Sequence, residues 1–214
     1  EVWTVAIEGA IGPASADHMQ RSLDKAVAAG ATAVVLRIDT PGGLDISMRE
    51  MIQAILAAPL PVVAYVAPGG ARAASAGTYL VYASSIAAMA PGTNLGAATP
   101  VQMGKPELPQ FGKEPAEEDS GTEGQRSPGP AMTAMEHKIV NDAVAYLQSL
   151  AQLRGRNVQW AEKAVREGDS LSAEAALKQR VIEITASSIP DLLEQLDGRE
   201  VPVGEGTAES NLRP

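Results

Sequence analysis

Cysteine is absent from the 214 residues, and histidine is scarce. The absence of cysteine excludes disulfides, a thiol nucleophile and thiolate metal sites. His18 and His137 are the only histidines, so we expect no histidine-rich zinc site and assign no metal. No apolar run approaches the ~20 residues that a membrane-spanning helix needs. Acids outnumber bases 26 to 17, and the net charge of −9 argues against a nucleic-acid partner.

The first third of the chain alternates strand-like and helix-like segments. Hydrophobic residues make up 45% of the sequence, which is enough for a real core. Ser15 is placed to cap the first helix. The expected strands are 2–7, 33–38 and 62–66, and the expected helices are 15–29 and 45–57. This order predicts parallel pairing through right-handed crossovers, and therefore an α/β fold. Ligands bind such sheets beyond the carboxyl ends of the strands, which directs attention to loops 39–43 and 67–74.

The second half begins with a shift in composition. From Pro100 to Pro130 the chain is rich in Pro, Gly, Glu and Lys without periodicity, and we expect a mobile surface loop. Met132 and Met135 open the apolar stripe of a long helix, about 131–153. Shorter helices are expected at 158–165, 173–179 and 189–196, with a strand at 181–185. We assign residues 1–200 to one domain and 201–214 to a polar, disordered tail.

Motifs for common cofactors are missing from the sequence. It contains no Walker phosphate loop, no G-x-G-x-x-G dinucleotide fingerprint, no H-E-x-x-H zinc helix and no calcium-loop spacing of acids. We therefore expect no cofactor.

Ser75 lies between the third strand and a helix-like run, among alanines and glycines. At such a junction the amide of Ala76 would point out of a helix N-terminus, where free N–H groups favour developing negative charge. This is the logic of a nucleophile elbow, although the first Gly of G-x-S-x-G is missing. The alternative is that Ser75 simply caps the helix.

Gly42 and Gly43 follow the neighbouring strand. A backbone N–H from this pair, together with that of Ala76, would form an oxyanion hole, in which each donor contributes roughly 3–4 kcal/mol in the transition state. The alternative is an ordinary Pro-Gly turn after Pro41.

A serine nucleophile needs a base. By helical periodicity His18 and His137 both project toward solvent, so a Ser–His–Asp triad is poorly supported. Lys138, at the flank of the apolar stripe, is the better candidate, although an amine can act as a base only if burial strips its proton. The alternative is a surface pair between Lys138 and Asp142, four residues apart on one helix.

Six segments in order resemble the N-terminal protease domain of the NfeD family, whose members are membrane-anchored serine proteases of the ClpP/crotonase fold encoded beside stomatin-like proteins. The segments are DTPGG at 39–43, ASAGTY at 74–79, PGTNLGAA at 91–98, KIVNDA at 138–143, LAQ at 150–152 with GRN at 155–157, and LSAEAAL at 171–177 running into 181–182. The resemblance covers nearly the whole chain outside 100–130 and the tail.

The resemblance implies a catalytic Ser–Lys dyad, with Ser75 as nucleophile and Lys138 as general base. The oxyanion donors would be the amides of Gly43 (or Gly42) and Ala76. ClpP itself uses a histidine soon after its serine, and none occurs here between 76 and 136, which favours lysine.

The resemblance also aligns Asp169 with an acidic residue that orients the lysine. The alternative is an acid at a helix start. Leu44, Met48 and Leu95 near the small-residue walls would suit an extended apolar peptide.

The family further implies the biological setting. Its substrates are apolar segments such as the hydrophobic C-terminal part of a stomatin-like membrane partner. We therefore expect a soluble domain of a membrane-anchored protein on the extracytoplasmic face, assembled as a homodimer or a higher homo-oligomer.

Two other functions compete with the protease. One is a catalytically silent scaffold that binds a stomatin-like membrane protein. The other is a crotonase-type enzyme acting on an acyl-CoA, which the acidic surface and the missing adenine–phosphate site disfavour. A scaffold needs neither Ser75 nor Lys138, so the presence of both favours the enzyme.

Overall fold

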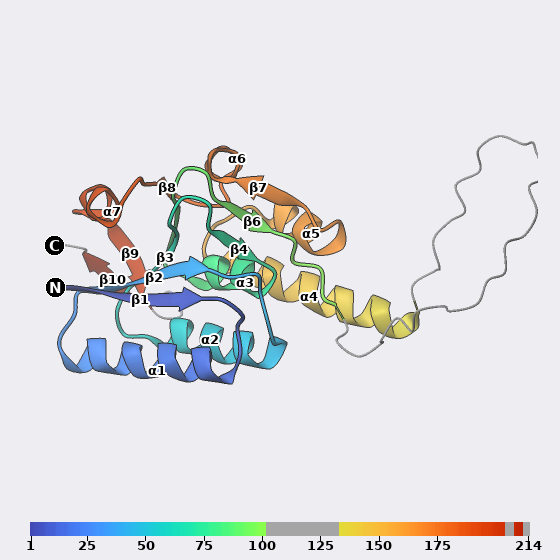
Figure 1. Cartoon of the computed structure of the whole chain (residues 1–214), viewed down its shortest axis with the longest axis horizontal. Helices are drawn as coiled ribbons and strands as arrows, with labels where there is room; N and C mark the ends of the chain where they lie inside the picture. Colours follow the sequence, from blue (N-terminus) through green and yellow to red (C-terminus); the bar gives the residue numbers. More distant parts are fainter. Residues whose placement is uncertain (102–132, 204–207, 212–214) are drawn as a thin grey trace, which may run out of the picture.

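The computed structural model describes residues 1–101, 133–203 and 208–211 (Figure 1). The predicted mobile loop therefore lies outside the described residues, apart from its first two. The first elements are β1 (Val2–Glu8), α1 (Pro13–Ala28), β2 (Ala33–Asp39), α2 (Asp45–Ala57), β3 (Val62–Val66), β4 (Arg72–Ala74), α3 (Ala76–Ala83), β5 (Ile86–Met89) and β6 (Asn94–Gly96). The later ones are α4 (Ala134–Leu153), α5 (Val158–Arg166), β7 (Ser170–Ser172), α6 (Ala173–Lys178), β8 (Ile184–Thr185), α7 (Ile189–Leu196), β9 (Glu200–Val203) and β10 (Ala208–Asn211).

The main sheet has five parallel strands in the order β1-β2-β3-β5-β8, which confirms the predicted α/β class. Side chains alternate between the two faces of β2, as strand geometry requires. Val34, Leu36 and Ile38 join one hydrophobic core, and Ala33 and Val35 join the other. Both faces of the sheet are therefore covered.

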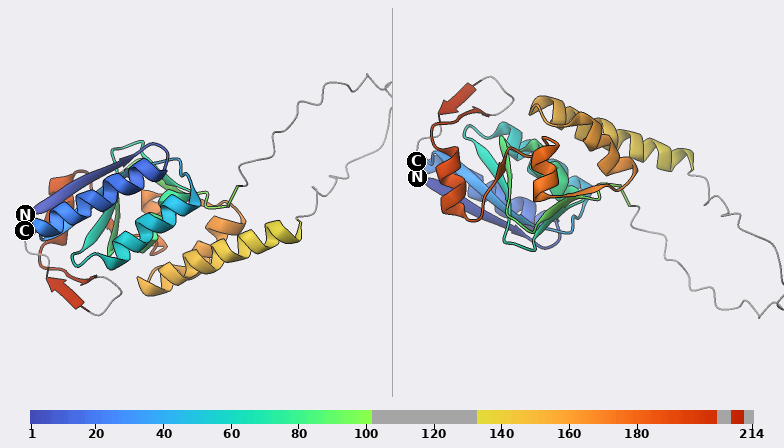
Figure 2. Two further views of the ribbon diagram at one scale, coloured as in Figure 1. Left: turned by 90° about the horizontal axis from the view of Figure 1, so that it is seen from below. Right: turned by 90° about the horizontal axis from the view of Figure 1, so that it is seen from above.

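The helices divide between these two faces. α1 and α2 run side by side under the sheet, with α3 next to α2 and α4 beyond, whereas α7 lies on the opposite side (Figures 1 and 2). α2 buries Met48, Met51, Ile52 and Ile55 along one stripe. This burial fixes α2 against the sheet, together with the loop that precedes it.

A second, small sheet of order β4-β6-β7 stands beside the first. A parallel bridge between Thr40 and Ala73 joins it to the end of β2. The sequence predicted only a loop over 67–74, and β4 corrects that prediction. The small sheet brings the turn after β4 next to the loop after β2.

Two helix starts differ from their predictions. α1 begins earlier, with Gly12 as its N-cap, and Ser15 lies one turn inside, where its hydroxyl accepts from the Gly12 amide at 2.9 Å. α4 is capped by Thr133, whose hydroxyl accepts from Glu136. Met135 is 62% exposed, so the predicted apolar stripe fails there, and Met132 lies outside the described residues. The buried stripe of α4 consists of Val140, Val144, Leu147, Leu150 and Ala151.

Near the C-terminus the sequence predictions were partly wrong. The predicted strand 181–185 shortens to β8, because the backbone of Val181 and Ile182 is still bonded to the end of α6. The tail was expected to be disordered, but β9 and β10 pair as an antiparallel ribbon, and Val201 and Val203 are buried.

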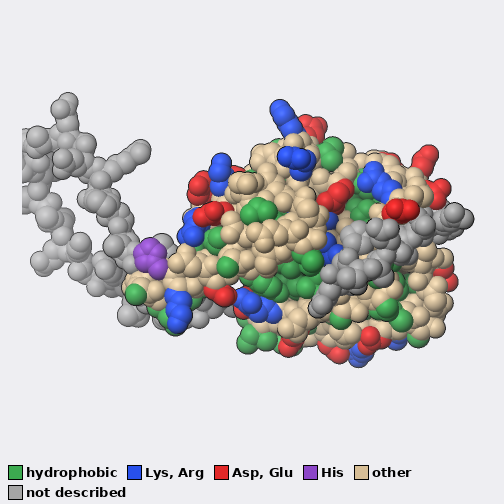
Figure 3. Space-filling view, turned by 180° about the vertical axis from the view of Figure 1, so that it is seen from behind, with side chains coloured by type: hydrophobic (Ala, Val, Ile, Leu, Met, Phe, Trp, Pro, Cys, Tyr) green, Lys and Arg blue, Asp and Glu red, His purple; other side chains and the backbone are tan. Residues whose placement is uncertain are grey.

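The surface carries charged side chains of both signs. Seen from behind, Lys, Arg, Asp and Glu are interspersed, and hydrophobic side chains gather near the middle of that face (Figure 3). None of the helices in the described part of the chain combines the length and apolar character needed to cross a bilayer.

Candidate active site

Ser75 occupies the turn from β4 into α3 and adopts φ 52° and ψ −118°. Residues other than glycine rarely hold a positive φ, and such strained residues cluster at functional sites. The Ser75 amide donates to the carbonyl of Gly96 at 2.9 Å, which holds the turn against β6. Ser75 is the N-cap residue of α3, but its side chain makes no capping hydrogen bond, so it does not cap the helix in the way that the alternative interpretation requires.

Gly42 makes this turn possible by lying directly against it. A Cβ on Gly42 would come within 2.6 Å of the Ser75 Cβ, and Gly42 has φ +108°. The Gly42 amide donates to the Thr40 hydroxyl at 3.0 Å. Because that N–H is engaged, the prediction that Gly42 might supply an oxyanion donor is corrected: Gly42 provides space, and its amide is used internally.

Gly43 and Ala76 offer the free amides. Gly43 pairs with Ile11 in a parallel bridge whose hydrogen bonds use the Gly42 carbonyl and the Leu44 amide. The N–H of Gly43 itself therefore faces away from Ile11. Ala76 is the first residue of α3, where amides lack helical acceptors. Within the described part of the chain, neither amide has an acceptor.

Ser75, Gly43 and Ala76 line one pocket of about 470 Å³. Of the predicted substrate-contacting residues, Leu44 and Met48 also line it. Leu95 does not, because it is 1% exposed and packed in the core between β4 and β7. Further lining comes from Pro41, Asp45, Arg49, Tyr79, Ala97, Ala98, Thr99, Pro100, Val101, Ala143 and Tyr146. The pocket is thus mostly apolar, with the Ser75 hydroxyl and the two amides at one part of its wall and the charged pair of Asp45 and Arg49 at another.

The sequence analysis missed a polar cluster at the rim of this pocket. Arg49 of α2 bonds Asp45 at 2.9 Å and Asp142 of α4 at 2.7 Å, and its guanidinium lies 4.4 Å from the ring centre of Tyr146. Tyr79 and Tyr146 are neighbouring rings, 6.0 Å apart. Local sequence patterns could not predict this cluster, because Arg49 and Asp142, the two partners of the bond between α2 and α4, lie 93 residues apart in the sequence.

Tyr79 is excluded as the base for Ser75. Burial, reinforced by Asp45, raises the pKa of its hydroxyl well above the ordinary value. Its hydroxyl donates to the Ala143 carbonyl at 3.3 Å. Tyr79 therefore stays protonated at neutral pH and forms part of the wall.

Lys138 lies in the second turn of α4, exposed to solvent and outside the lining of the Ser75 pocket. The expected surface pair with Asp142 does not form, because Asp142 bonds Arg49 instead. His18 and His137 are both exposed, as predicted. The structure therefore brings Ser75 together with the amides of Gly43 and Ala76, and leaves the Lys138 amine outside the pocket that they line.

Asp169 does not meet Lys138 in this structure. Its carboxylate accepts from the Trp160 indole at 2.8 Å and from the Ser170 amide at 2.9 Å. Its carbonyl accepts from Ala97. Asp169 therefore anchors the start of β7 to α5 and to the end of β6, behind Ser75.

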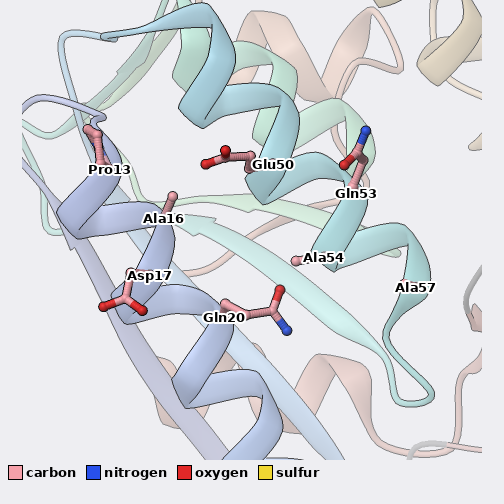
Figure 4. A pocket seen from close by; sticks show the side chains of 8 residues that line it. All are labelled: Pro13, Ala16, Asp17, Gln20, Glu50, Gln53, Ala54 and Ala57. Carbon is pink, nitrogen blue, oxygen red and sulfur yellow. The ribbon is translucent and has the colours of Figure 1, made fainter.

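A second hollow, of about 500 Å³, lies between α1 and α2 (Figure 4). Gln20 and Glu50 extend into it, and its other lining residues are mostly small or polar. It contains no serine or amine for hydrolysis. Among the described residues, no group of acids and histidines is arranged to hold a metal ion.

The chain is similar to known proteins over nearly its whole length. The family model described as the NfeD1b N-terminal domain matches residues 1–185. The membrane-bound protease PH1510 of Pyrococcus horikoshii is 36% identical over 202 residues, 94% of this chain and 41% of that protein. The membrane protein NfeD1b of Bacillus subtilis is 38% identical over 97 residues, 45% of this chain and 22% of that protein. The chain thus spans less than half the length of these curated relatives.

Solved structures extend the similarity to the fold. A lysine-to-alanine mutant of the 1510-N membrane-bound stomatin-specific protease, in complex with a substrate peptide, superposes with a TM-score of 0.82 at 34% identity, covering 99% of this chain and 87% of that one. A serine-to-alanine mutant of the same protease gives 0.80 at 35% identity, covering 98% and 92%.

Proposed function

Because the chain belongs to the NfeD1b N-terminal-domain family, we propose that it is a serine endopeptidase in which Ser75 is the nucleophile and Lys138 the general base. One observation carries the proposal. The strained turn at Ser75 presents a hydroxyl to a pocket that also holds the free amides of Gly43 and Ala76. A structural serine needs neither the strain nor the donors. Acyl transfer needs the donors, because negative charge develops on the carbonyl oxygen next to the attacking hydroxyl, and strained turns of this kind cluster at functional sites.

The proposed reaction is a two-step acyl transfer. Neutral Lys138 takes the Ser75 proton as the oxygen attacks a peptide carbonyl, and the amides of Gly43 and Ala76 hold the oxyanion. The lysine then protonates the leaving amine, and the acyl group stays on Ser75 as an ester. Water attacks the ester with Lys138 again as base, which releases the second product and restores the serine.

Lys138 has to approach Ser75 for this reaction. It stands one turn before Asp142, and residues four apart share a helix face. Asp142 bonds Arg49 at the rim of the pocket, and Ala143 and Tyr146 of the same helix line it. Lys138 therefore lies on the side of α4 that faces the pocket rim. Catalytic contacts are often long without substrate and tighten in the complex. The relative's structures support the pair by residue type, because a serine and a lysine are the residues replaced there.

The substrate we propose is an apolar segment of a stomatin-like membrane protein. The relative is described as stomatin-specific and as membrane-bound. Here the pocket walls are apolar, and Leu44 and Val101 are 43% and 81% exposed beside it. We further propose that the domain acts on the extracytoplasmic face of a membrane and as a homodimer or higher homo-oligomer.

The scaffold remains the second candidate, and the exposed position of Lys138 is the observation that favours it. A chain that only docks a stomatin-like protein would keep the apolar pocket and would not need to close the dyad.

Cleavage of an apolar peptide by wild type, Ser75→Ala and Lys138→Ala decides between the two functions. Lys25→Ala is the matched control, since Lys25 is another exposed helical lysine, in α1. We expect cleavage by wild type and the control, and at most traces with the two dyad variants. Equal cleavage by all four proteins would overturn the dyad. Peptide binding by all four without turnover would establish the scaffold.

A further inference from the structure

Arg49 connects α2, which follows the Gly43 loop, to α4, which carries Lys138. It belongs to α2, while Asp142 and Tyr146, which it bonds and covers, belong to α4. Within the described ranges, no other ion pair connects α2 to α4. The guanidinium of Arg49 is thus a direct link between α2 and α4 at the pocket rim.

Each helix carries one part of the proposed chemistry. Gly43, an oxyanion donor, directly precedes α2, and the buried stripe of α2 holds that end in place. Lys138 is on α4, one turn before Asp142. The bond between Arg49 and Asp142 thus links the element that places the oxyanion to the element that places the base.

Few side chains in the first two turns of α4 are buried. Burial along α4 begins at Val140, whereas Met135, His137 and Lys138 are exposed. The bonds from Arg49 to Asp142 and from Tyr79 to Ala143 come directly after this exposed stretch. A small tilt of α4 at this point would move the Lys138 amine, while the buried stripe farther along would stay in place.

We infer that Arg49 is a positioning residue for the Ser75–Lys138 dyad: by holding Asp142 and Tyr146, it fixes the part of α4 from which Lys138 reaches Ser75. The inference rests on the proposed function. It assigns Arg49 no proton transfer and no contact with the reacting atoms. The guanidinium is already neutralised by Asp45 and Asp142, so it is poorly suited to bind a charged substrate group.

The first test separates positioning from stability. Asp142→Asn removes the charge of the inter-helix bond with little change in shape, and Arg49→Met removes the guanidinium. Asp17→Asn is the matched control, because Asp17 is also an exposed carboxylate paired with an arginine, on α1. We expect kcat for the apolar peptide to fall about tenfold or more in both test variants, since small misplacements of catalytic groups are costly. The KM and the melting temperature of both test variants should match those of Asp17→Asn. Asp142→Glu, which keeps the negative charge, should retain most of the wild-type kcat.

The second test asks whether the effect passes through Lys138. The rate at which an aryl sulfonyl fluoride labels Ser75 is compared in wild type, Asp142→Asn, Lys138→Ala and the double variant. If Arg49 and Asp142 act by placing Lys138, Asp142→Asn slows the labelling of Ser75 when Lys138 is present. The same substitution then leaves the labelling rate unchanged in the Lys138→Ala background.

Each possible result of these two tests either supports or contradicts the positioning role of Arg49. Equal slowing by Asp142→Asn in both backgrounds, a parallel drop in melting temperature, or an unchanged kcat would each overturn the positioning role. A wild type that labels no faster than Lys138→Ala would instead overturn the dyad itself, so failure of the proposed function is recognised separately.

Discussion

The Cα of Gly42 faces Ser75 so closely that a side chain on the glycine would meet the Ser75 Cβ at 2.6 Å and its Oγ at 3.1 Å. Two segments 33 positions apart in the sequence thus touch at the turn that holds Ser75. The contact leaves no room for a methyl group, and the positive φ of Gly42 adds a second obstacle.

Gly42→Ala should therefore lower both the stability of the fold and the reactivity of the Ser75 hydroxyl. The new Cβ has to displace the Ser75 turn, and positive-φ strain alone costs of order 1–3 kcal/mol. We expect a lower urea midpoint and loss of Ser75 labelling by a sulfonyl fluoride. Gly12→Ala is the control, because Gly12 has an extended backbone with nothing within 4 Å of its added Cβ. Normal labelling in Gly42→Ala would show that the close contact is dispensable.

Replacing Arg156 or Arg154 by methionine should change the stability of the fold in opposite directions. Arg156 is 5% exposed, and it bonds both carboxylate oxygens of Glu183 and three carbonyls near the end of α3. Arg156→Met removes the Arg156 donors from all of these, although Glu183 keeps the bond from the Ala87 amide, and should cost about 3 kcal/mol or more, as for other broken buried pairs.

Arg154→Met should be neutral or stabilising. Two of its nitrogens are buried without a partner, and burial, with help from Arg156, lowers the pKa of its guanidinium to about 10. A cation whose pKa is lower in the folded state than in the unfolded state destabilises the folded state while it is charged. Removing the charge therefore removes this destabilisation. Among the described residues, the hydrogen bond from the Arg154 Nε to the Ala83 carbonyl is the only one that Arg154→Met removes. Denaturant unfolding of the two variants side by side checks the contrast, and equal destabilisation would contradict it.

Asp191 should make stability depend on pH in the acid range. Hydrogen bonds from the Ser187 amide, Gln195 and the Ser187 hydroxyl lower the pKa of its carboxyl below the ordinary 3.8. Its contribution is therefore fully present above the ordinary pKa and is lost as the pH falls through the lowered, folded-state pKa. Asp191→Asn should lower the melting temperature at pH 7, and the difference should shrink below about pH 4. A difference that is independent of pH would sink this assignment.

Asp169→Asn should lower the stability of the fold more than it lowers kcat. An amide can keep only one of the two bonds that the carboxylate accepts from Trp160 and Ser170. We expect a stability loss of about 1 kcal/mol with kcat nearly unchanged. A large fall in kcat at unchanged stability would instead support the role predicted from the family resemblance, in which Asp169 orients Lys138.

The central sheet was predictable because its signals are local. The strands β1, β2 and β3 are apolar runs bounded by Gly or Pro, and α2 was predicted at its observed bounds. The three-residue strands β4, β6 and β7 carry no such pattern. Arg72–Ala74 becomes a strand only because Thr40 and Asn94–Gly96 lie on either side of it, which is a tertiary effect.

The site was predictable in its residue types and not in its details. Ser75, Gly43 and Ala76 were placed together because loops after neighbouring parallel strands meet. Which glycine has a free amide depends on the Thr40 hydroxyl, because that hydroxyl accepts from the Gly42 amide. The burial of Leu95 and the rim formed by Arg49 depend on contacts between distant segments. Periodicity along one helix could not reveal either.

The proposed nucleophile, both proposed oxyanion donors and the carbonyl that steadies the turn all precede residue 102, whereas the proposed base follows residue 132. A change in the length of the stretch between them would therefore leave the spacing of the proposed acyl-accepting residues along the chain unchanged. Diversification within the lineage is then freest at this junction, and orthologues should vary there in length while the turn around Ser75 keeps its spacing.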